Sequence, residues 1–403
     1  MSPDRKEIEE LLTRSISYIF PSREELSAYL LGGKKLKIYL GVDATGPELH
    51  IGHATNLIFL EKLRRLGHEI ILLFGDFTAR IGDPTDKGAA RTRLTEEEVL
   101  LNIKDWKSQA QKILDFNARD NPAQILQNSA WLGKLSLPDV VELASSITVQ
   151  QMLERDMFEK RIEERKPIYL HEFLYPLLQG YDSVAMDVTA EVGGNDQIFN
   201  MFVGRELQKR YHNKEKFVIA TTLLENPKTG KKLMSKSEGS YIALSDAPSL
   251  MYGKAMALPD ETMVSVFTDC TFLPLETIGD YAQMLHGGAN PRDIKMKLAQ
   301  ELVKTYHSER DAQAAEHAFV SAFQKKETPD EVQEVIAQKG DFLGKVLLLH
   351  GVVASNADFR RLVKEGAVRD MDTGAKIDDH TAILEKDVVL KIGKKRFVRI
   401  VVG

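Results

Sequence analysis

Hydrophobic and polar positions in the first third of the chain predict a parallel β-sheet covered by helices. The hydrophobic run 37–42 is short, and the segment 43–47 that follows it contains the glycine and proline of a turn. Leucines then recur at helical spacing from Leu57 to Leu66, and a second hydrophobic run occupies 69–75. A strand, a helix and a strand joined by tight turns are typical of the βαβ unit of a parallel sheet.

The pattern farther along the chain is mostly helical. We expect an amphipathic helix over 104–116, a mostly helical insertion over about 129–165 and a further strand within 216–224. Residues 249–323 have a helical pattern that prolines interrupt, and the charged segment 325–341 suits a linker. The predicted fold class is α/β: a Rossmann-like doubly wound parallel sheet, followed by an α-helical domain and a small C-terminal α/β domain.

These segments divide the chain into three predicted domains. The sheet domain covers 1–240, including the insertion at about 129–165, and the α-helical domain covers 241–325. A linker over 326–341 then leads to the small α/β domain of residues 342–403.

Composition and charge restrict the class of protein. With 403 residues, 43% hydrophobic and 28% charged, the chain has the composition of a globular protein of several domains. Its net charge of −5 excludes an overall nucleic-acid-binding field, so any RNA contact must come from local basic patches. The single cysteine, Cys270, excludes disulfides within the chain and cysteine-based metal clusters. No apolar run reaches the roughly 20 residues that span a bilayer, and the N-terminus has no apolar signal core. We therefore expect a cytoplasmic protein with no membrane partner.

The first candidate for chemistry is the sequence His50-Ile51-Gly52-His53, at the start of the predicted helix. A helix N-terminus favours anions such as phosphate, and His50 and His53 share one face of it. Their N–H groups would stabilise a nucleoside triphosphate whose α-phosphorus is being attacked, and Gly52 would allow the ligand close to the backbone. The alternative interpretation is a helix cap or a metal pair.

The second candidate is the loop between Gly230 and Gly239, which contains Lys232, Leu233, Met234, Ser235 and Lys236. Glycines at both ends are typical of a flap that closes over a ligand. The alternative is an ordinary solvated loop, but the upstream histidines favour a phosphate clamp made of two parts.

This ordered pair resembles the H-I-G-H and K-M-S-K-S motifs of the class I aminoacyl-tRNA synthetases. Leu233 stands where the family has its first lysine, with Lys232 one position upstream, whereas Lys236 keeps its place. The resemblance implies catalytic roles for His50, His53, Lys236 and Thr45. It also implies ATP binding by the following residues: Gly52, Gly194, Asp196, Met234, Ser235, Lys87 and Arg91.

The middle of the chain is similar to the bacterial tyrosyl-tRNA synthetases that end in a small RNA-binding domain. The similarity is carried by Tyr175-Pro176-Leu177-Leu178-Gln179-Gly180-Tyr181-Asp182 and by Gly193-Gly194-Asn195-Asp196-Gln197. Tyr39 and Asp182 would reach the phenolic hydroxyl of the amino acid. A site built for this hydroxyl excludes phenylalanine, because its polar groups would be left unpaired. This enzyme class is the standard example of that effect. By resemblance, the α-ammonium group would be held by Asp83, Tyr175, Gln179 and Gln197. The alternatives are an ordinary helix face for Tyr175 and Gln179, and a turn aspartate before proline for Asp83.

The polar segment 76–93 has the composition of an active-site flap. Lys87 and Arg91 would neutralise pyrophosphate as it leaves, and solvated loop charge is the competing interpretation.

The C-terminus carries a candidate RNA-binding surface. Ser355 is a predicted helix N-cap, after which hydrophobic residues face inward and basic ones outward, and a basic hairpin-like segment ends the chain. This end resembles an RNA-binding domain shared with a ribosomal small-subunit protein. The resemblance implies phosphate contacts by Arg360, Arg361, Lys364, Lys394, Lys395 and Arg396. The alternative is an ordinary charged face, since nearby aspartates dilute the positive charge.

The resemblance implies a tyrosyl-tRNA synthetase that forms tyrosyl-adenylate and transfers tyrosine to tRNA(Tyr). Its substrates would be L-tyrosine and ATP with Mg²⁺, with no prosthetic group and no metal site of its own. It would be a homodimer with residues 129–165 near the interface. By the same resemblance, 1–240 is the catalytic domain, 241–325 lies on the anticodon side and 342–403 binds RNA. A tryptophanyl enzyme and a non-catalytic RNA-binding paralogue remain as alternatives.

Overall fold

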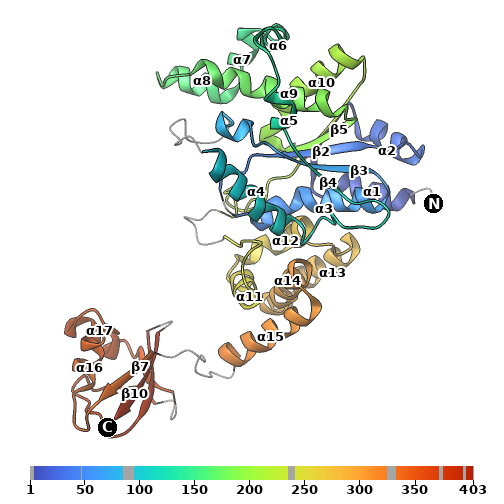
Figure 1. The fold of residues 1–403 in the computed structure, drawn as a ribbon. Helices are drawn as coiled ribbons and strands as arrows, with labels where there is room; N and C mark the ends of the chain where they lie inside the picture. Colours follow the sequence, from blue (N-terminus) through green and yellow to red (C-terminus); the bar gives the residue numbers. More distant parts are fainter. Residues whose placement is uncertain are drawn as a thin grey trace. The chain divides into compact units, whose positions relative to one another are not determined.

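The computed structural model describes residues 4–46, 48–84, 95–234, 241–324, 333–371, 375–393 and 396–402. The chain separates into two compact units, residues 1–313 and residues 314–403 (Figure 1).

The first unit is built on a six-stranded sheet. Its strands are β1 (Ile16–Phe20), β2 (Lys37–Val42), β3 (Glu69–Phe74), β4 (Gln124–Gln127), β5 (Ala190–Gly194) and β6 (Phe217–Thr221). Their order is β1-β6-β5-β2-β3-β4, and every neighbouring pair is parallel except β1 with β6. The chain therefore proceeds from β2 to one edge of the sheet and returns to β5 on the other side of β2. This confirms the predicted doubly wound sheet, in which the crevice between β2 and β5 is the usual place for a ligand.

Helices cover both faces of this sheet. In Figure 1, α9 and α10 lie on one side of the strands and α3 lies on the other. The helices of the unit are α1 (Arg5–Thr13), α2 (Arg23–Leu31), α3 (Ile51–Arg65), α4 (Glu96–Ala110), α5 (Ser129–Leu132), α6 (Leu137–Ala144), α7 (Val149–Leu153), α8 (Asp156–Glu163), α9 (Leu174–Met186), α10 (Ile198–His212), α11 (Pro248–Met256), α12 (Met263–Cys270), α13 (Leu275–His286) and α14 (Pro291–Tyr306), and α15 (Glu309–Gln324) crosses into the second unit.

The predicted strand–helix–strand segment is confirmed, and the hydrophobic residues that predict it are buried. Leu57, Leu60 and Leu63 of α3 are buried, as the leucine spacing predicts. Five of the six residues of β3 are buried as well, which is typical of a central parallel strand covered on both faces. Helix α12 packs against α3, so the helices after residue 248 extend the same compact unit.

Helix α4 begins earlier than the predicted amphipathic helix of 104–116. Thr95 and Glu98 form a capping box in which each side chain accepts a hydrogen bond from the backbone N–H of the other. Because this cap satisfies N–H groups that have no partner within the helix, the helix starts at Glu96. It ends at Ala110, before the predicted end.

The second unit contains a four-stranded sheet in the order β7-β10-β9-β8. Its elements are β7 (Gln333–Ala337), α16 (Leu343–Leu349), α17 (Asn356–Lys364), β8 (Val368–Asp370), β9 (Val388–Ile392) and β10 (Arg396–Val402). The predicted N-cap is confirmed, because the Ser355 side chain accepts a hydrogen bond from the N–H of Asp358. The linker prediction of 326–341 was wrong for 333–337. Val335 and Ala337 point into the core, and the segment pairs in parallel with β10.

Within the described residues, every helix is too short or too polar to cross a membrane.

Candidate functional site

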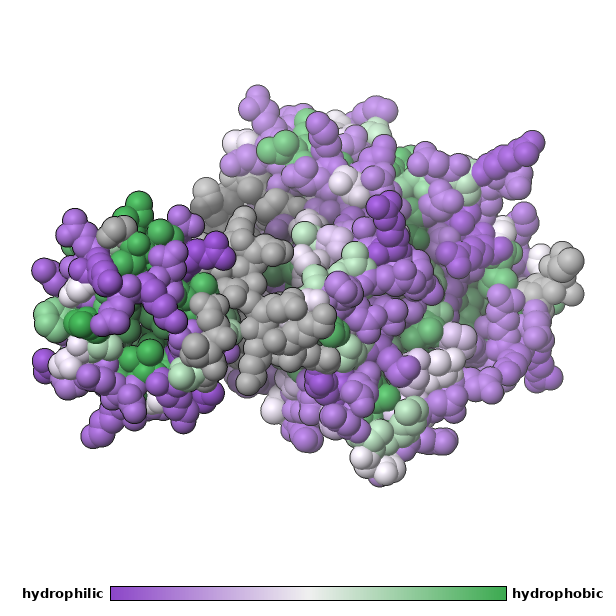
Figure 2. Space-filling model, turned by 90° about the horizontal axis from the view of Figure 1, so that it is seen from below, coloured by the Kyte–Doolittle hydropathy of each residue, from purple (hydrophilic) through white to green (hydrophobic). Residues whose placement is uncertain are grey.

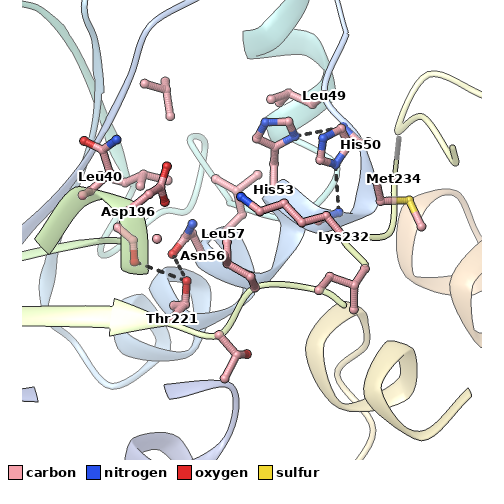
Figure 3. Close-up of a pocket in the computed structure, with 18 of the residues that line it drawn as sticks. Leu40, Leu49, His50, His53, Asn56, Leu57, Asp196, Thr221, Lys232 and Met234 are labelled. Carbon is pink, nitrogen blue, oxygen red and sulfur yellow. Dashed lines mark hydrogen bonds between the residues drawn. The ribbon is translucent and has the colours of Figure 1, made fainter. Parts of the chain in front are cut away.

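The candidate site lies at the carboxyl ends of β2 and β5, where the strand order reverses. A cavity of about 900 Å³ is lined by residues of β2, α3 and β5 and by residues 221–225 and 230–234 (Figure 3). A second cavity of about 490 Å³ adjoins it, with His50, His53 and Gln197 lining both. We refer to them as the first pocket and the second pocket.

The two histidines of the first motif form a cap at the start of α3. His50 Nδ1 accepts a hydrogen bond from the N–H of Gly52 at 3.1 Å, and His53 Nδ1 accepts one from the N–H of His50 at 3.1 Å (Figure 3). Each ring therefore carries its proton on Nε2 when neutral, so Nε2 is a donor. Burial lowers the pKa of His53 to about 4, which keeps it neutral at physiological pH. The predicted helix cap and the predicted donor pair are thus compatible.

Gly52 has a structural role as well. A Cβ atom at this position would lie 2.9 Å from Cε1 of His50 and 3.7 Å from Met234. The absence of a side chain therefore lets the His50 ring fold back over the helix terminus and keeps this part of the first pocket open.

Most of the predicted ATP-binding residues lie together. Gly52, Gly194, Asp196 and Met234 line the first pocket, whereas Thr45, predicted to be catalytic, lines the second. Lys232, beside the displaced position Leu233, also lines the first pocket and extends past His53 in Figure 3. Four predicted residues lie outside the described part of the chain: Ser235, Lys236, Lys87 and Arg91.

Sequence reasoning missed a polar pair in the first pocket. The Oγ1 of Thr221, at the end of β6, donates a hydrogen bond to Oδ1 of Asn56 on α3 at 2.9 Å (Figure 3). Both residues line the pocket. The position of Thr221 at the carboxyl end of a parallel strand was the signal that marks it.

The predicted contact to a phenolic hydroxyl centres on Asp182 of α9. Its carboxylate accepts hydrogen bonds from Nε1 of Trp131 at 2.7 Å and Nδ2 of Asn128 at 3.2 Å. Asn128 also donates to Oγ1 of Thr78 at 3.0 Å. Burial raises the pKa of Asp182 well above its ordinary value. The residues that support Asp182 were not predicted, since each is remote from it in sequence and adjacent only in the fold.

Tyr39 was also predicted to contact the phenolic hydroxyl, and that role stays a prediction. Its side chain is completely buried, and its hydroxyl lies 3.0 Å from Oγ of Ser183 on α9. Gly41 follows two residues later on the same face of β2, and it lines both pockets, whereas Tyr39 lines neither. Because the glycine has no side chain, the wall of the cavity lies at Gly41 and Tyr39 packs behind it.

The other predicted tyrosine-binding residues line the second pocket. Nε2 of Gln197 donates to Asp83 at 2.7 Å, and the hydroxyl of Tyr175 donates to Oδ2 of Asp43 at 2.9 Å. Gln179, one helical turn after Tyr175 on α9, donates through Nε2 to Glu191 at 3.1 Å. Burial raises the pKa of Tyr175 well above its ordinary value, so its hydroxyl remains a donor. Asp43 was missed, although it directly follows β2.

The described residues contain no group of three or more His, Cys, Asp or Glu side chains that could hold a metal ion. The pockets themselves offer imidazole, amide and carboxylate groups, which are suited to a polar organic ligand and its phosphates.

The predicted RNA-binding residues of the second unit are exposed where they are described. Arg360, Arg361 and Lys364 lie on the solvent side of α17, and Arg396 begins β10. Arg361 is paired with Asp358 at 2.7 Å and with Glu365 at 3.1 Å, which reduces its local charge. Lys394 and Lys395 lie outside the described residues. The surface in Figure 2 is mainly hydrophilic, and several hydrophobic residues of this unit are also exposed: Ile336, Phe342, Leu349 and Ile383.

Comparison with known proteins agrees with these observations. Residues 32–324 match the family model of tRNA synthetases class I (W and Y). A tyrosine–tRNA ligase 2 of Vibrio cholerae is 43% identical over 97% of each chain. A tyrosine–tRNA ligase of Moorella thermoacetica is 41% identical over 97% of this chain and 94% of its own.

Solved structures show the same fold. A truncated mitochondrial tyrosyl-tRNA synthetase of Aspergillus nidulans superposes with a TM-score of 0.68 at 22% identity, covering 79% of this chain and 94% of its own. The tyrosyl-tRNA synthetase of Archaeoglobus fulgidus, solved with L-tyrosine, has a TM-score of 0.59 at 22% identity and covers 78% of this chain and all of its own. The family resemblance predicted from the two motifs is therefore confirmed: the chain belongs to the tRNA synthetases class I (W and Y).

Proposed function

We propose that this protein is a tyrosine–tRNA ligase. It would activate L-tyrosine with ATP, giving tyrosyl-adenylate and pyrophosphate, and then transfer tyrosine to the 3′ terminal adenosine of tRNA(Tyr). The observation that carries this proposal is the buried Asp182, held by Trp131 and Asn128 at the end of the second pocket. A hydroxyl that donates to this carboxylate supplies a hydrogen bond that phenylalanine lacks. The two relatives named above, at 41–43% identity over nearly the whole chain, support the same activity.

The first step requires no covalent intermediate with the protein. The carboxylate of tyrosine attacks the α-phosphorus of ATP, and pyrophosphate leaves with the electrons of the broken P–O bond. The Nε2–H groups of His50 and His53 would donate to the phosphate oxygens as charge develops there. Because burial keeps His53 neutral, it acts as a hydrogen-bond donor through Nε2–H and not as a general acid. In this proposal Lys236 adds positive charge, with Thr45 as a further donor.

The two ends of the amino acid would be held by different residues. Asp182 would accept the phenolic hydroxyl, and the α-ammonium group would lie against Asp83, Tyr175, Gln179 and Gln197, all of which line the second pocket. ATP would occupy the first pocket, with its ribose against Gly194 and Asp196 and its phosphates toward the histidines. Lys87 and Arg91 would neutralise the departing pyrophosphate. Mg²⁺ would enter bound to the phosphates of ATP, since the described residues offer no carboxylate cage for it.

The remaining parts of the chain would serve tRNA binding and assembly. The exposed cations of the second unit, Arg360, Lys364 and Arg396, are suited to RNA phosphates. A homodimer would form through the insertion before α9, where exposed hydrophobic side chains gather: Leu137, Val141, Val149, Ile162, Tyr169 and Leu170. We place the enzyme in the cytoplasm, where its tRNA substrate is found.

Amino-acid-dependent ATP–pyrophosphate exchange tests this function. We expect exchange with tyrosine, little with phenylalanine and none with tryptophan, and a large loss of the exchange rate in His53→Ala. Exchange with tryptophan in place of tyrosine would replace the proposal by a tryptophanyl enzyme. A folded protein that binds tRNA and exchanges with no amino acid would favour the non-catalytic paralogue.

A further inference from the structure

A buried ion pair lies behind the second pocket, and neither of its members lines either pocket. Lys216, immediately before β6, is 0% exposed, and Glu191 of β5 is 2% exposed. The ammonium group of Lys216 donates to Oε2 of Glu191 and, at 2.9 Å, to Oγ of Ser183. Removing two charges from water costs about as much as their attraction returns, so a buried ion pair is weak evidence of a role in stability. A role in the site is the alternative.

The pair reaches the pocket through Gln179. The second oxygen of Glu191, Oε1, accepts the hydrogen bond from Nε2 of Gln179 at 3.1 Å. Oε1 of Gln179 is buried and has no hydrogen-bond partner among the described residues, and this side chain lines the second pocket. A glutamine amide has one donor end and one acceptor end. Because the anion behind it holds the donor end, the acceptor end is the one left without a protein partner in the described part of the chain.

The surroundings are shaped to hold this ion pair. A Cβ atom on Gly204 of α10 would lie 2.6 Å from Nζ of Lys216 and 2.8 Å from Oγ of Ser183. The ammonium group therefore occupies the space that a side chain at this position would fill. The Tyr39 ring lies on another side, with Nζ of Lys216 5.9 Å from its centroid. Tyr39 therefore packs against the ion pair.

We infer that Glu191 and Lys216 are positioning residues that orient the amide of Gln179 to accept a hydrogen bond from the α-ammonium group of the amino-acid substrate. The inference rests on the proposed function. Glu191 holds the amide nitrogen, and Lys216 holds the carboxylate in place. If the amide were reversed, its NH₂ group would face the ammonium group, where two donors repel each other. Burial lowers the pKa of Lys216, and the negative charge of Glu191 opposes that shift.

The isosteric variant Glu191→Gln tests the inference. Lys216 would hold the oxygen of the new amide, so its NH₂ group would point at Gln179 and turn that side chain around. We expect the dissociation constant for L-tyrosine to rise roughly 10- to 150-fold, the range for a hydrogen bond to a charged group. The des-amino analogue of tyrosine, in which hydrogen replaces the ammonium group, should bind with unchanged affinity. Isothermal titration calorimetry of both ligands measures this, and binding of the analogue also reports that the variant is folded.

A second substitution separates positioning from a structural role. In the double variant Glu191→Gln with Lys216→Met, the new amide is free to turn its oxygen to Gln179, so most of the affinity for tyrosine should return. The matched control is Glu191→Gln with Lys214→Met, which removes an exposed lysine two residues away and should restore nothing. Equal losses for tyrosine and the des-amino analogue, or absence of rescue by Lys216→Met, would overturn the inference. Wild-type protein that binds neither ligand would instead overturn the proposed function.

Discussion

The substitution Asp182→Asn addresses the selection of tyrosine directly. The native carboxylate accepts two hydrogen bonds, from Trp131 and Asn128, and has further lone pairs for the hydroxyl of a ligand. An asparagine of the same shape has one oxygen and one NH₂ group. Its NH₂ group must therefore face Trp131, Asn128 or the ligand, each of which presents a donor, and at least one hydrogen bond is lost.

The magnitude follows from the charge and burial of this group. Asp182 is 2% exposed, so a lost hydrogen bond is not replaced by water. A hydrogen bond to a charged group contributes about 1.5–3 kcal/mol, which corresponds to a loss of roughly 10- to 150-fold in kcat/KM for tyrosine. Phenylalanine makes no hydrogen bond at this position, so its kcat/KM should change little. The preference for tyrosine over phenylalanine should therefore fall by the same factor.

The assay is ATP–pyrophosphate exchange with each amino acid in turn, and thermal unfolding serves as the control for folding. Equal losses for tyrosine and phenylalanine would refute the reasoning, because the carboxylate would then act on the shape of the pocket and not on the hydroxyl. An unchanged preference would also refute it. The hydroxyl would then be recognised elsewhere, and Asp182 would serve only to hold Asn128 and Trp131.

Three further predictions concern stability and assembly. Gly204→Ala should destabilise the protein by about 1–3 kcal/mol in urea unfolding, because its Cβ would collide with Lys216. The control is Gly253→Ala in α11, where a Cβ atom would have nothing within 4 Å. It should be neutral or stabilise the protein by up to about 1 kcal/mol. The pKa of buried His68 is lowered to about 4 from an ordinary value of 6.5, so the unfolded state binds its proton first. The unfolding temperature should thus decline as the pH falls from 6.5 to 4, and His68→Gln should weaken this decline. Leu170→Asp, at a side chain 78% exposed, should shift the protein from dimer to monomer in light scattering, and an unchanged mass would remove this face from the proposed interface.

The sequence predicts those elements of the fold whose buried residues form an uninterrupted run or a regular spacing along the chain. The hydrophobic run of β3 and the leucines of α3 are local signals, so the βαβ unit was predictable. Strand β4 has the sequence Gln-Ile-Leu-Gln, and β5 contains Glu191 and two glycines, so neither shows a strand pattern. They are strands because the parallel neighbours already in place bond to their backbones.

The residues of the candidate site likewise fall into those that a local pattern predicts and those that it does not. Tyr175, Gln179 and Asp182 were predictable because they lie within a few residues of one another on α9. Asn128 supports Asp182 from 54 residues away, and Lys216 contacts Glu191 from 25 residues away. No local pattern marks such partners, since the sheet topology alone brings them together. Tyr39 is a further example: its place on β2 was predictable from the hydrophobic run, whereas its contact with Ser183 of α9 arises only in the fold.

In the proposed function, helix α9 would connect recognition of the two ends of the substrate. Tyr175, Gln179 and Asp182 follow one another at helical spacing and all line the second pocket, along about 10 Å of the helix axis. Separate strands support them, with Glu191 behind Gln179 and Asn128 beside Asp182. Burial raises the pKa of Asp182, and the negative charge of Glu191 adds to the shift. Glu191→Gln removes that charge and should therefore lower the pKa of Asp182 while it misorients Gln179. Discrimination against the des-amino analogue should then fall, whereas discrimination against phenylalanine should hold or improve. If discrimination against the des-amino analogue and discrimination against phenylalanine both fell, α9 itself would have moved.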